Sequence, residues 1–416
     1  MNKKQTFLKY IMVIYIILMA LLPSDFRIKG IPLRGDIIFG LLVVIYLMML
    51  FVVRESRKNF IYGIIDFFKD YLSMFMVLLF IIMCISISYA VDKKIALSES
   101  IRFLSYIVFY FIIKYEMSNE KILESILKSY IYVCSIVSVL GILQFFTKIG
   151  LSEKFIYSTG AFKVRITSTL ENPNSLGAFL ILAVFPMIML TLYETNRKKK
   201  VRYMCISILL FTNIILTGSR NAWLGFLVGS IVMIVIYNWK FIVPFILASI
   251  TSLFIPMVRN RIKDFGKISQ DGRVNLWKIA FEMIKDHPII GVGNGNYYSL
   301  HGEYVKKYPQ FDYNHHEYFP VHNSYLKIQS ELGIFASMCF GGLIISILIK
   351  TKQFINNCNN IFFKAFYKGF YISIFSFLVM NMADNLFFVP KITVYFWILV
   401  AISQAMIYNN KRESII

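Results

Sequence analysis

Long apolar segments recur along most of the chain, and they restrict its possible folds more than any other feature. A helix needs about 20 predominantly apolar residues to cross the hydrocarbon core of a bilayer. Inside lipid, a helix satisfies all its own backbone polar groups. The sequence therefore predicts an all-α, polytopic membrane protein, organised as a single integral membrane domain over residues 1–416. About twelve transmembrane helices are expected, at 7–23, 36–53, 71–91, 100–115, 122–146, 174–193, 201–217, 221–238, 241–257, 323–349, 361–383 and 386–408.

The composition agrees with a membrane protein. Charged residues make up 16% of the chain, against about 25% in soluble domains, and the mean hydropathy is +0.63. The N-terminus resembles a signal peptide, but no small-residue cleavage site follows Leu21-Leu22-Pro23, so we expect a retained first span. The five cysteines are scattered without CxxC spacing, which indicates neither a disulfide framework nor a metal site.

The positive charges predict the orientation of the spans. The net charge of +21 could suit nucleic acid, but basic residues gather at alternate ends of the spans, which is typical of cytoplasmic loops. With twelve spans, these clusters all fall on one side, so we expect both termini in the cytoplasm and no nucleic-acid partner. The basic clusters are Lys3–Lys9, Arg54–Lys58, Arg197–Arg202, Lys350–Lys352 and Lys411–Arg412.

A polar segment over 258–322, between the ninth and tenth predicted spans, interrupts the apolar pattern. The orientation places it outside the cytoplasm as one large loop. The pattern of 273–286 predicts an amphipathic helix that lies in the membrane interface or caps the bundle. The glycines of 291–295 do not open a helix after a strand, so we interpret them as a flexible turn rather than a nucleotide-binding loop. All five histidines lie in this segment: His287, His301, His315, His316 and His322.

Three arginines lie where a charge is costly in a membrane protein. Arg165 precedes the sixth span, Arg220 lies in a tight turn between the seventh and eighth, and Arg273 begins the predicted helix. Arginine binds phosphate oxygens with two parallel hydrogen bonds, so three guanidinium groups at one mouth would suit a diphosphate. Alternatively, each arginine extends to the membrane surface and has no further role.

His322 is the best candidate general base, because a neutral imidazole accepts a proton at physiological pH. The alternative is a histidine that only caps a helix end. His315 and His316, together with His322, could also suggest zinc, but their spacing matches no familiar ligand pattern. We therefore expect no metal and no cofactor. Possible helpers of His322 are Asn323, Glu331 and Glu317.

Several ordered motifs complete the pattern. They are Arg165 with 170–177, then 216–225 around Arg220, 272–277 around Arg273, 287–295, and 322–326 with 331–333. Together they make the chain similar to the O-antigen ligase and O-antigen polymerase superfamily of bacterial envelope enzymes. The motifs cover roughly residues 160–340, and the rest of the chain agrees with that family in span count and topology.

The resemblance implies a metal-independent, inverting glycosyl transfer at the outer face of the bacterial plasma membrane. The donor would be a glycan on undecaprenyl diphosphate, and the acceptor a glycan or a lipid. By the same resemblance, Arg220 and Arg273 would bind the diphosphate with help from Arg165, and His322 would activate the acceptor hydroxyl. Membrane lipid, a flippase and a chain-length regulator would be the other partners.

Two alternatives remain open at this stage. The enzyme could polymerise repeat units of a surface polysaccharide (O-antigen, capsule or teichuronic type), which we favour, or ligate a finished chain to a lipid core, a protein or the wall. A protein of another class, a lipid-linked oligosaccharide flippase or transporter, would carry charges near the midplane of its spans. Here the polar groups gather at one face, and Asp384, the main exception, would also lie near the outer mouth.

Overall fold

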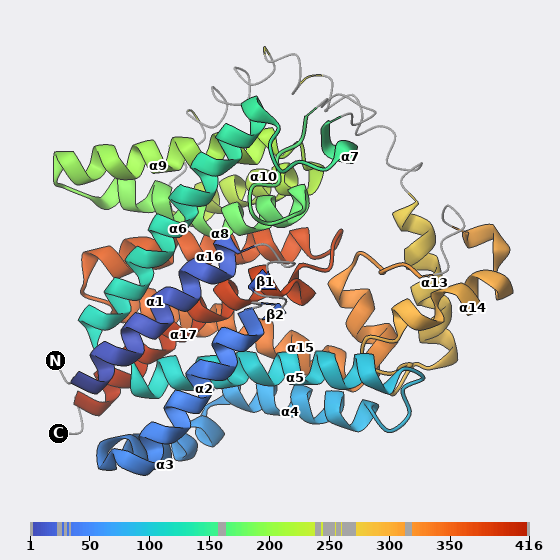
Figure 1. The fold of residues 1–416 in the computed structure, drawn as a ribbon, viewed down its shortest axis with the longest axis horizontal. Coiled ribbons are helices and arrows are strands. Elements are labelled where there is room, and N and C mark those ends of the chain that lie inside the picture. The colour runs from blue at the N-terminus through green and yellow to red at the C-terminus, as the bar shows by residue number, and fades with distance from the viewer. Residues whose placement is uncertain are drawn as a thin grey trace.

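A computed structural model describes residues 3–22, 27–28, 31–32, 35–156, 164–237, 243, 254, 259, 272–312 and 318–413. Helices dominate this part of the chain (Figure 1). Strands β1 (Arg27–Ile28) and β2 (Ile31–Pro32) form one short antiparallel pair. The helices are α1 (Lys3–Leu21), α2 (Gly35–Val52), α3 (Arg54–Lys69), α4 (Tyr71–Ser86), α5 (Lys93–Phe111) with a π-helical continuation η1 (Ile112–Glu116), α6 (Glu120–Thr147), α7 (Glu153–Ile156), α8 (Pro173–Tyr193), α9 (Arg197–Leu216), α10 (Arg220–Ile236), α13 (Arg273–Asp286), α14 (Tyr297–Lys307), η4 (Pro309–Phe311), α15 (Ser324–Asn357), α16 (Ile361–Met380), η5 (Leu386–Phe388) and α17 (Pro390–Glu413).

The predicted class, a polytopic helical membrane protein, is confirmed. Within the described residues, six helices are long and apolar enough to cross a membrane, or up to seven if the bent pair Phe39–Val52 and Arg54–Lys69 is one span. Three shorter apolar helices join them, at Gln5–Leu21, Tyr71–Ser86 and Arg220–Ile236. Helices occupy eleven of the twelve predicted spans, and the span predicted at 241–257 lies outside the described residues apart from positions 243 and 254. The count of twelve and the orientation of the termini stay predictions.

One helix was not anticipated. Residues predicted as a basic loop form α3, which meets the preceding helical segment at 109°. Its protein-facing side carries Ser56, Asn59, Gly63 and Phe67, spaced three or four residues apart. This spacing is the helical period, so α3 packs along one side against its neighbours.

The centre of the bundle is formed by α8, α16 and α17. The most apolar windows of α8 and α17 are 78% and 83% buried, whereas that of α15 is 39% buried. The backbones of α8 and α16 approach closely at Gly369, where a Cβ atom would overlap Phe185 and Pro186. Small residues let helices pack at short distance in membranes. Here Gly369 sets the position of α16, and the C-terminal end of α16 leads into the candidate site.

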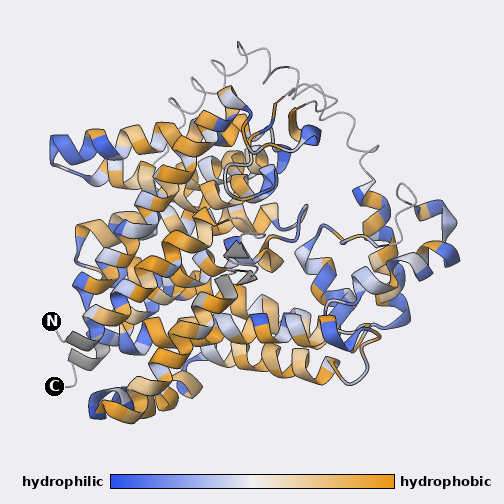
Figure 2. Cartoon of the chain, viewed as in Figure 1, coloured by the Kyte–Doolittle hydropathy of each residue, from blue (hydrophilic) through white to orange (hydrophobic). Residues whose placement is uncertain are grey.

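The predicted helix at 273–286 is confirmed as α13. Its buried residues are Leu276, Ile279, Ala280 and Met283. It packs against α14 in a second hydrophobic core, separate from that of the bundle. These two helices lie at the opposite end of the molecule from the start of α1 and the end of α17 (Figure 1), and they are more hydrophilic than the bundle (Figure 2).

The glycine turn after α13 brings the backbone close to the bundle. Gly291 and Gly293 have φ values of 68° and 106°, which only glycine adopts readily. The backbone nitrogens of Val292 and Gly293 donate to the carbonyl oxygens of Ser330 and Glu331 at 2.9 and 2.8 Å. The turn therefore docks α13 and α14 onto α15.

Candidate active site

The turn between α16 and α17 lies at the centre of the candidate site. The backbone nitrogen of Ser324 donates to the Asn381 carbonyl oxygen at 2.9 Å. The Ser324 hydroxyl donates to Asn381 Oδ1 at 2.6 Å, and the Phe387 backbone nitrogen donates to the same oxygen at 2.9 Å. Both Ser324 and Asn381 are fully buried. These bonds fix the start of α15 to the turn, so residues on either segment keep a constant separation.

His322 and Asp384 face each other across this junction. The Nδ1 atom of His322 lies 3.1 Å from Asp384 Oδ1. Side-chain exposure is 26% for the histidine and 13% for the aspartate, so the imidazole is reachable while the carboxylate is mostly enclosed. An ionised carboxylate accepts a proton, which favours the tautomer with hydrogen on Nδ1. In that tautomer Nε2 carries the lone pair and can act as a base.

The backbone of His322 is held in an unusual conformation. Its φ is 51°, a value that non-glycine residues seldom adopt and that often marks functional sites. The Trp277 indole nitrogen donates to the His322 carbonyl oxygen at 3.4 Å. Asn323 then caps α15 by accepting from the backbone nitrogens of Tyr325 and Leu326, each at 3.0 Å. The strained residue is therefore enclosed between α13 and the start of α15.

Asp384 is kept ionised by its surroundings. Burial alone would raise its pKa, but the hydrogen bond and charge of His322, with the charge of Arg273, hold the pKa below its ordinary value. Asn174 Nδ2 donates to Asp384 Oδ2 at 3.1 Å, and the Asn385 backbone nitrogen donates to Oδ1 at 2.9 Å. Both carboxylate oxygens therefore accept hydrogen bonds, which stabilises the charged form.

Four helices begin around this turn. Asn174 in the first turn of α8 binds Asp384, and Asn221 in the first turn of α10 donates to the Met380 carbonyl oxygen at 2.9 Å. Arg273, the first residue of α13, donates to the Ala383 carbonyl oxygen at 2.8 Å, and α15 begins at Ser324. Helix N-termini carry partial positive charge and bind anions. Their convergence makes this end of the bundle suited to a phosphate group.

The three predicted arginines lie around the same network at different depths. Arg273 contacts the turn directly. Arg220 follows Ser219, whose hydroxyl donates to Asn174 Oδ1 at 2.8 Å. Arg165 Nε donates to the Thr217 carbonyl oxygen at 3.0 Å, two residues before Ser219. All three are half-buried. The structure thus connects the arginines to His322 through short hydrogen-bonded paths.

A cleft of about 460 Å³ opens beside His322. Asn174, His322, Asp384 and Lys327 line it, together with Tyr298 from α14. Ligand-binding pockets have volumes of about 300–1,000 Å³. None of the three arginines is among the lining residues, so contact with a ligand in this cleft would require their side chains to extend toward its edge.

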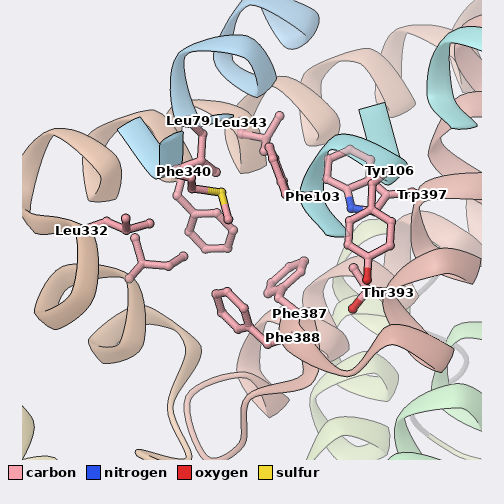
Figure 3. A pocket seen from close by; sticks show the side chains of 12 residues that line it. Leu79, Phe103, Tyr106, Leu332, Phe340, Leu343, Phe387, Phe388, Thr393 and Trp397 are labelled. Atoms are coloured by element: carbon pink, nitrogen blue, oxygen red, sulfur yellow. The ribbon is translucent and has the colours of Figure 1, made fainter. Parts of the chain in front are cut away.

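A smaller apolar pocket of about 40 Å³ adjoins the cleft and shares Phe388 with it. Figure 3 shows the side chains of this pocket, drawn from α4, α5, α15 and α17 and from the segment before α17. Its labelled residues are Leu79, Phe103, Tyr106, Leu332, Phe340, Leu343, Phe387, Phe388, Thr393 and Trp397. The polar cleft beside His322 is therefore adjacent to an apolar pocket formed by helices of the bundle.

The predicted helpers have contacts typical of positioning residues. Glu331 is 1% exposed. It accepts from the backbone nitrogens of Gly295 and Tyr297 at 2.8 and 3.3 Å and pairs with Lys327 at 2.7 Å. Gly333, two residues on, has a φ of 77°, and a Cβ there would overlap the Ile289 carbonyl oxygen. Glu331 thus holds the glycine turn against α15. Glu317, His315 and His316 lie outside the described residues.

Sequence reasoning missed the partners of His322. Asp384 was placed near the same mouth but given no role, and Asn174 and Ser219 were quoted within motifs without an assignment. The available signal was a lone carboxylate between two apolar spans, which is expensive unless it has a partner. Among the described residues, no group of three His, Cys, Asp or Glu side chains could hold a metal ion.

Comparison with known families agrees with the motifs. Residues 205–341 match the model of a family described as O-antigen ligase. This segment of the chain is thus similar to that family, and the similarity supports the predicted superfamily. The matched segment runs from within α9 through α10, α13, α14 and η4 to the first part of α15, and so includes Arg220, Arg273 and His322. The predicted resemblance is confirmed. It supports a multi-pass membrane protein that takes part in glycosyl transfer in the cell envelope. No curated protein matches the chain significantly.

Proposed function

We propose that the chain transfers a glycan from a polyprenyl diphosphate to an acceptor hydroxyl at the outer face of the bacterial plasma membrane. The observation that carries this proposal is the His322–Asp384 pair beside a cleft, surrounded by four helix N-termini in a chain similar to the O-antigen ligase family. The favoured reaction is polymerisation of the repeat units of a surface polysaccharide. A ligase would differ in the acceptor and not in the site.

The proposed reaction is a displacement at the anomeric carbon of the donor sugar. His322 Nε2 accepts the proton of the acceptor hydroxyl while that oxygen attacks the anomeric carbon of the donor sugar. The bond between that carbon and the phosphate oxygen breaks, and polyprenyl diphosphate leaves with the bonding electrons. Attack from the side opposite the leaving group inverts the anomeric centre. Asp384 stabilises the imidazolium that forms, and no metal is required.

The leaving group is where the arginines act. Negative charge grows on the diphosphate in the transition state, and fixed donors stabilise it without reorganisation. Arg220 and Arg273 stand at the first positions of α10 and α13, so their side chains and the helix N-termini add in the same direction. Arg165 supports them from the adjacent segment. The apolar pocket beside Phe388 offers a non-polar surface to the lipid next to the phosphate.

Reconstitution tests the proposal. The purified chain is placed in liposomes with a lipid-linked repeat unit and EDTA, and both polymer and released lipid diphosphate are measured. We expect both products from the wild type and a rate lower by about 10²–10⁴-fold for His322→Ala. Lys285→Gln, an exposed change on α13, is the control and is expected to behave as wild type. Wild-type rates in His322→Ala, or loss of activity in EDTA, would remove the proposed mechanism.

A further inference from the structure

A second large cleft lies on the other side of the segment that carries Arg165. It has a volume of about 630 Å³ and is bordered by the C-terminal end of α6, by α7 and by residues 167–171. We call it the α6 cleft; its lining includes Leu143, Gln144, Thr147, Phe155, Ser168 and Glu171. Glu171 lines the α6 cleft and Asn172 lines the His322 cleft, so two consecutive residues separate the two spaces.

The wall between the clefts is held in a defined conformation. Gln144 Oε1 accepts from the backbone nitrogens of Thr167 and Ser168 at 2.9 and 2.7 Å. Ser168 and Glu171 have φ values of 49° and 63°. Among the described residues, the other non-glycine positions with positive φ are Lys148, beside the same cleft, and His322. Strained backbone concentrates at functional sites, and here it occurs beside both clefts.

The wall is also tied to the arginine network. The Arg165 backbone nitrogen donates to the Phe155 carbonyl oxygen at 2.9 Å, and the Arg165 side chain binds Thr217. Lys391 Nζ pairs with Glu171 at 2.9 Å and donates to the Thr169 carbonyl oxygen at 3.2 Å. An occupant of the α6 cleft would therefore contact the segment that positions Arg165.

The side chains that line the cleft indicate which class of ligand it could bind. None of the lining residues, all of which are described, carries a positive charge, so the cleft is unsuited to a diphosphate. Its polar lining consists of several hydroxyl groups with the Gln144 amide and the Glu171 carboxylate, both bonded within the protein, beside the apolar faces of Leu143 and Phe155. A sugar presents the same mixture, with hydroxyls around its edge and C–H groups on its faces. Such pockets combine an apolar surface with a few polar groups that fix orientation.

We propose that the α6 cleft binds a saccharide segment of the glycan substrate, at a distance from the reacting bond. This inference rests on the proposed function, because it assigns the cleft to the sugars of the same substrate. The His322 cleft then holds the reacting sugar, and the α6 cleft holds sugars further along the chain. Retention of these sugars would keep a growing glycan on the enzyme between additions.

Binding of a free saccharide tests this directly and needs no turnover. The probe is the phosphate-free oligosaccharide, one to four repeat units long, released by mild acid from the lipid-linked glycans of the host cell. Equilibrium dialysis is performed on the full chain in nanodiscs, comparing wild type, Phe155→Leu and Phe146→Leu. Phe146 is 75% exposed near the same end of α6 and does not line the cleft, so it is the matched control.

We expect saturable binding to the wild type, affinity lower by about two- to tenfold for Phe155→Leu because a ring contact is lost, and no change for Phe146→Leu. Lys285→Gln, an exposed change on α13 that lines neither cleft, is expected to bind the probe like the wild type. Equal affinity in all variants, an equal loss in Phe146→Leu and Phe155→Leu, or a co-purified phospholipid that Phe155→Leu releases without any saccharide binding would overturn the proposal. Saccharide binding without lipid diphosphate release in the reconstituted assay would instead contradict the proposed function alone.

Discussion

Two groups of charged side chains lie far apart in the bundle, and they are built on opposite principles. One surrounds His322 and Asp384 at the start of α15. The other, the Lys114 cluster, comprises Asp66, Asp70, Lys114 and Lys350, with Lys350 26 positions after Ser324 in the same helix. The helix is interrupted at Gly333, whose φ and ψ are not helical, and at a rise of 1.5 Å per residue its two parts together separate these positions by up to roughly 39 Å. The molecule therefore places one cluster at each end of α15.

The Lys114 cluster is saturated. Lys114 Nζ lies 2.9 Å from both Asp66 Oδ2 and Asp70 Oδ2, and Lys350 pairs with the other oxygen of Asp70. Side-chain exposure is 5% for both Lys114 and Asp70. Two carboxylates and two ammonium groups cancel, and the π-helical turn η1 places Lys114 between them. This arrangement connects α3, α5 and α15 and is suited to a structural role.

The His322 site is unsaturated by comparison. One carboxylate serves an imidazole and a nearby guanidinium, and helix N-termini add positive potential around a cleft of about 460 Å³. The space beside His322 is open, so a substrate can reach the imidazole. A buried charge alone therefore does not indicate function. Balance and access distinguish a structural cluster from a candidate active site.

The largest change is expected from a substitution in the Lys114 cluster, and it tests the structural role of that cluster. Lys114→Met leaves two carboxylates with one ammonium group between them, and breaking a buried ion pair costs about 3–5 kcal/mol. We expect a correspondingly lower unfolding free energy, measured by SDS titration, with normal activity in the molecules that stay folded. Lys128→Met is the control, because Lys128 is half-exposed and pairs with Glu124 on the helix surface, where such a pair contributes under about 1 kcal/mol. Normal stability in Lys114→Met would contradict the structural role.

Arg220→Ala tests the His322 site. In contrast to Lys114→Met, it should lower activity and leave stability nearly unchanged. Removal of one transition-state donor lowers a rate by about 10²–10³-fold, while the half-buried position of Arg220 predicts little loss of folding. We expect polymer formation to be nearly abolished in a protein that still inserts in the membrane, measured by polymer gels and by membrane fractionation. Arg202→Ala, on the exposed N-terminal end of α9, is the control. Near-normal polymer length in Arg220→Ala would remove its proposed role.

The sequence supported the fold more fully than the site. Spacing of Leu276, Ile279 and Met283 was sufficient to predict α13, because an amphipathic helix is a local property. Residues 54–69 lie between two predicted spans, and only the basic cluster at their start was interpreted, although the period of Ser56, Asn59 and Gly63 is helical. Local patterns could have located α3, and only its angle to α2 required the structure.

The site depends on contacts that no local pattern contains. Asp384 and His322 are 62 residues apart, and Asn174 is 210 residues from Asp384. These pairs are set by the packing of α8 against α16 and by the bonds between Ser324 and Asn381. Glu331 was proposed as a helper from its motif. Its role in holding Gly295 and Tyr297 could not be seen before the glycine turn was placed on α15.

Asp384→Asn tests whether the charge of Asp384 sets the tautomer of the His322 imidazole. The substitution keeps the size of the side chain but removes the charge that favours hydrogen on His322 Nδ1. A hydrogen bond to a charged group contributes about 1.5–3 kcal/mol, which corresponds to a rate lower by about 10–100-fold. The expected signature is a lower maximal rate with an unchanged KM for the lipid-linked donor. An equal effect of Asp286→Asn, whose carboxylate binds Tyr304 and Lys307 away from the cleft, would show that the loss is not specific to this site.

The smallest expected effect is a pH dependence of stability that comes from the same carboxylate. His322 and Arg273 hold the pKa of Asp384 below its ordinary value, so its folded pKa is lower than its unfolded pKa of about 3.9. The stabilisation is therefore complete above about pH 4 and is lost as the pH falls through the folded pKa. We expect the melting temperature of the wild type to fall more steeply than that of Asp384→Asn as the pH falls below about 4. Parallel melting curves for the two proteins would mean that the carboxylate is not ionised in the folded state, and the pairing that distinguishes this site from the Lys114 cluster would then lose its electrostatic basis.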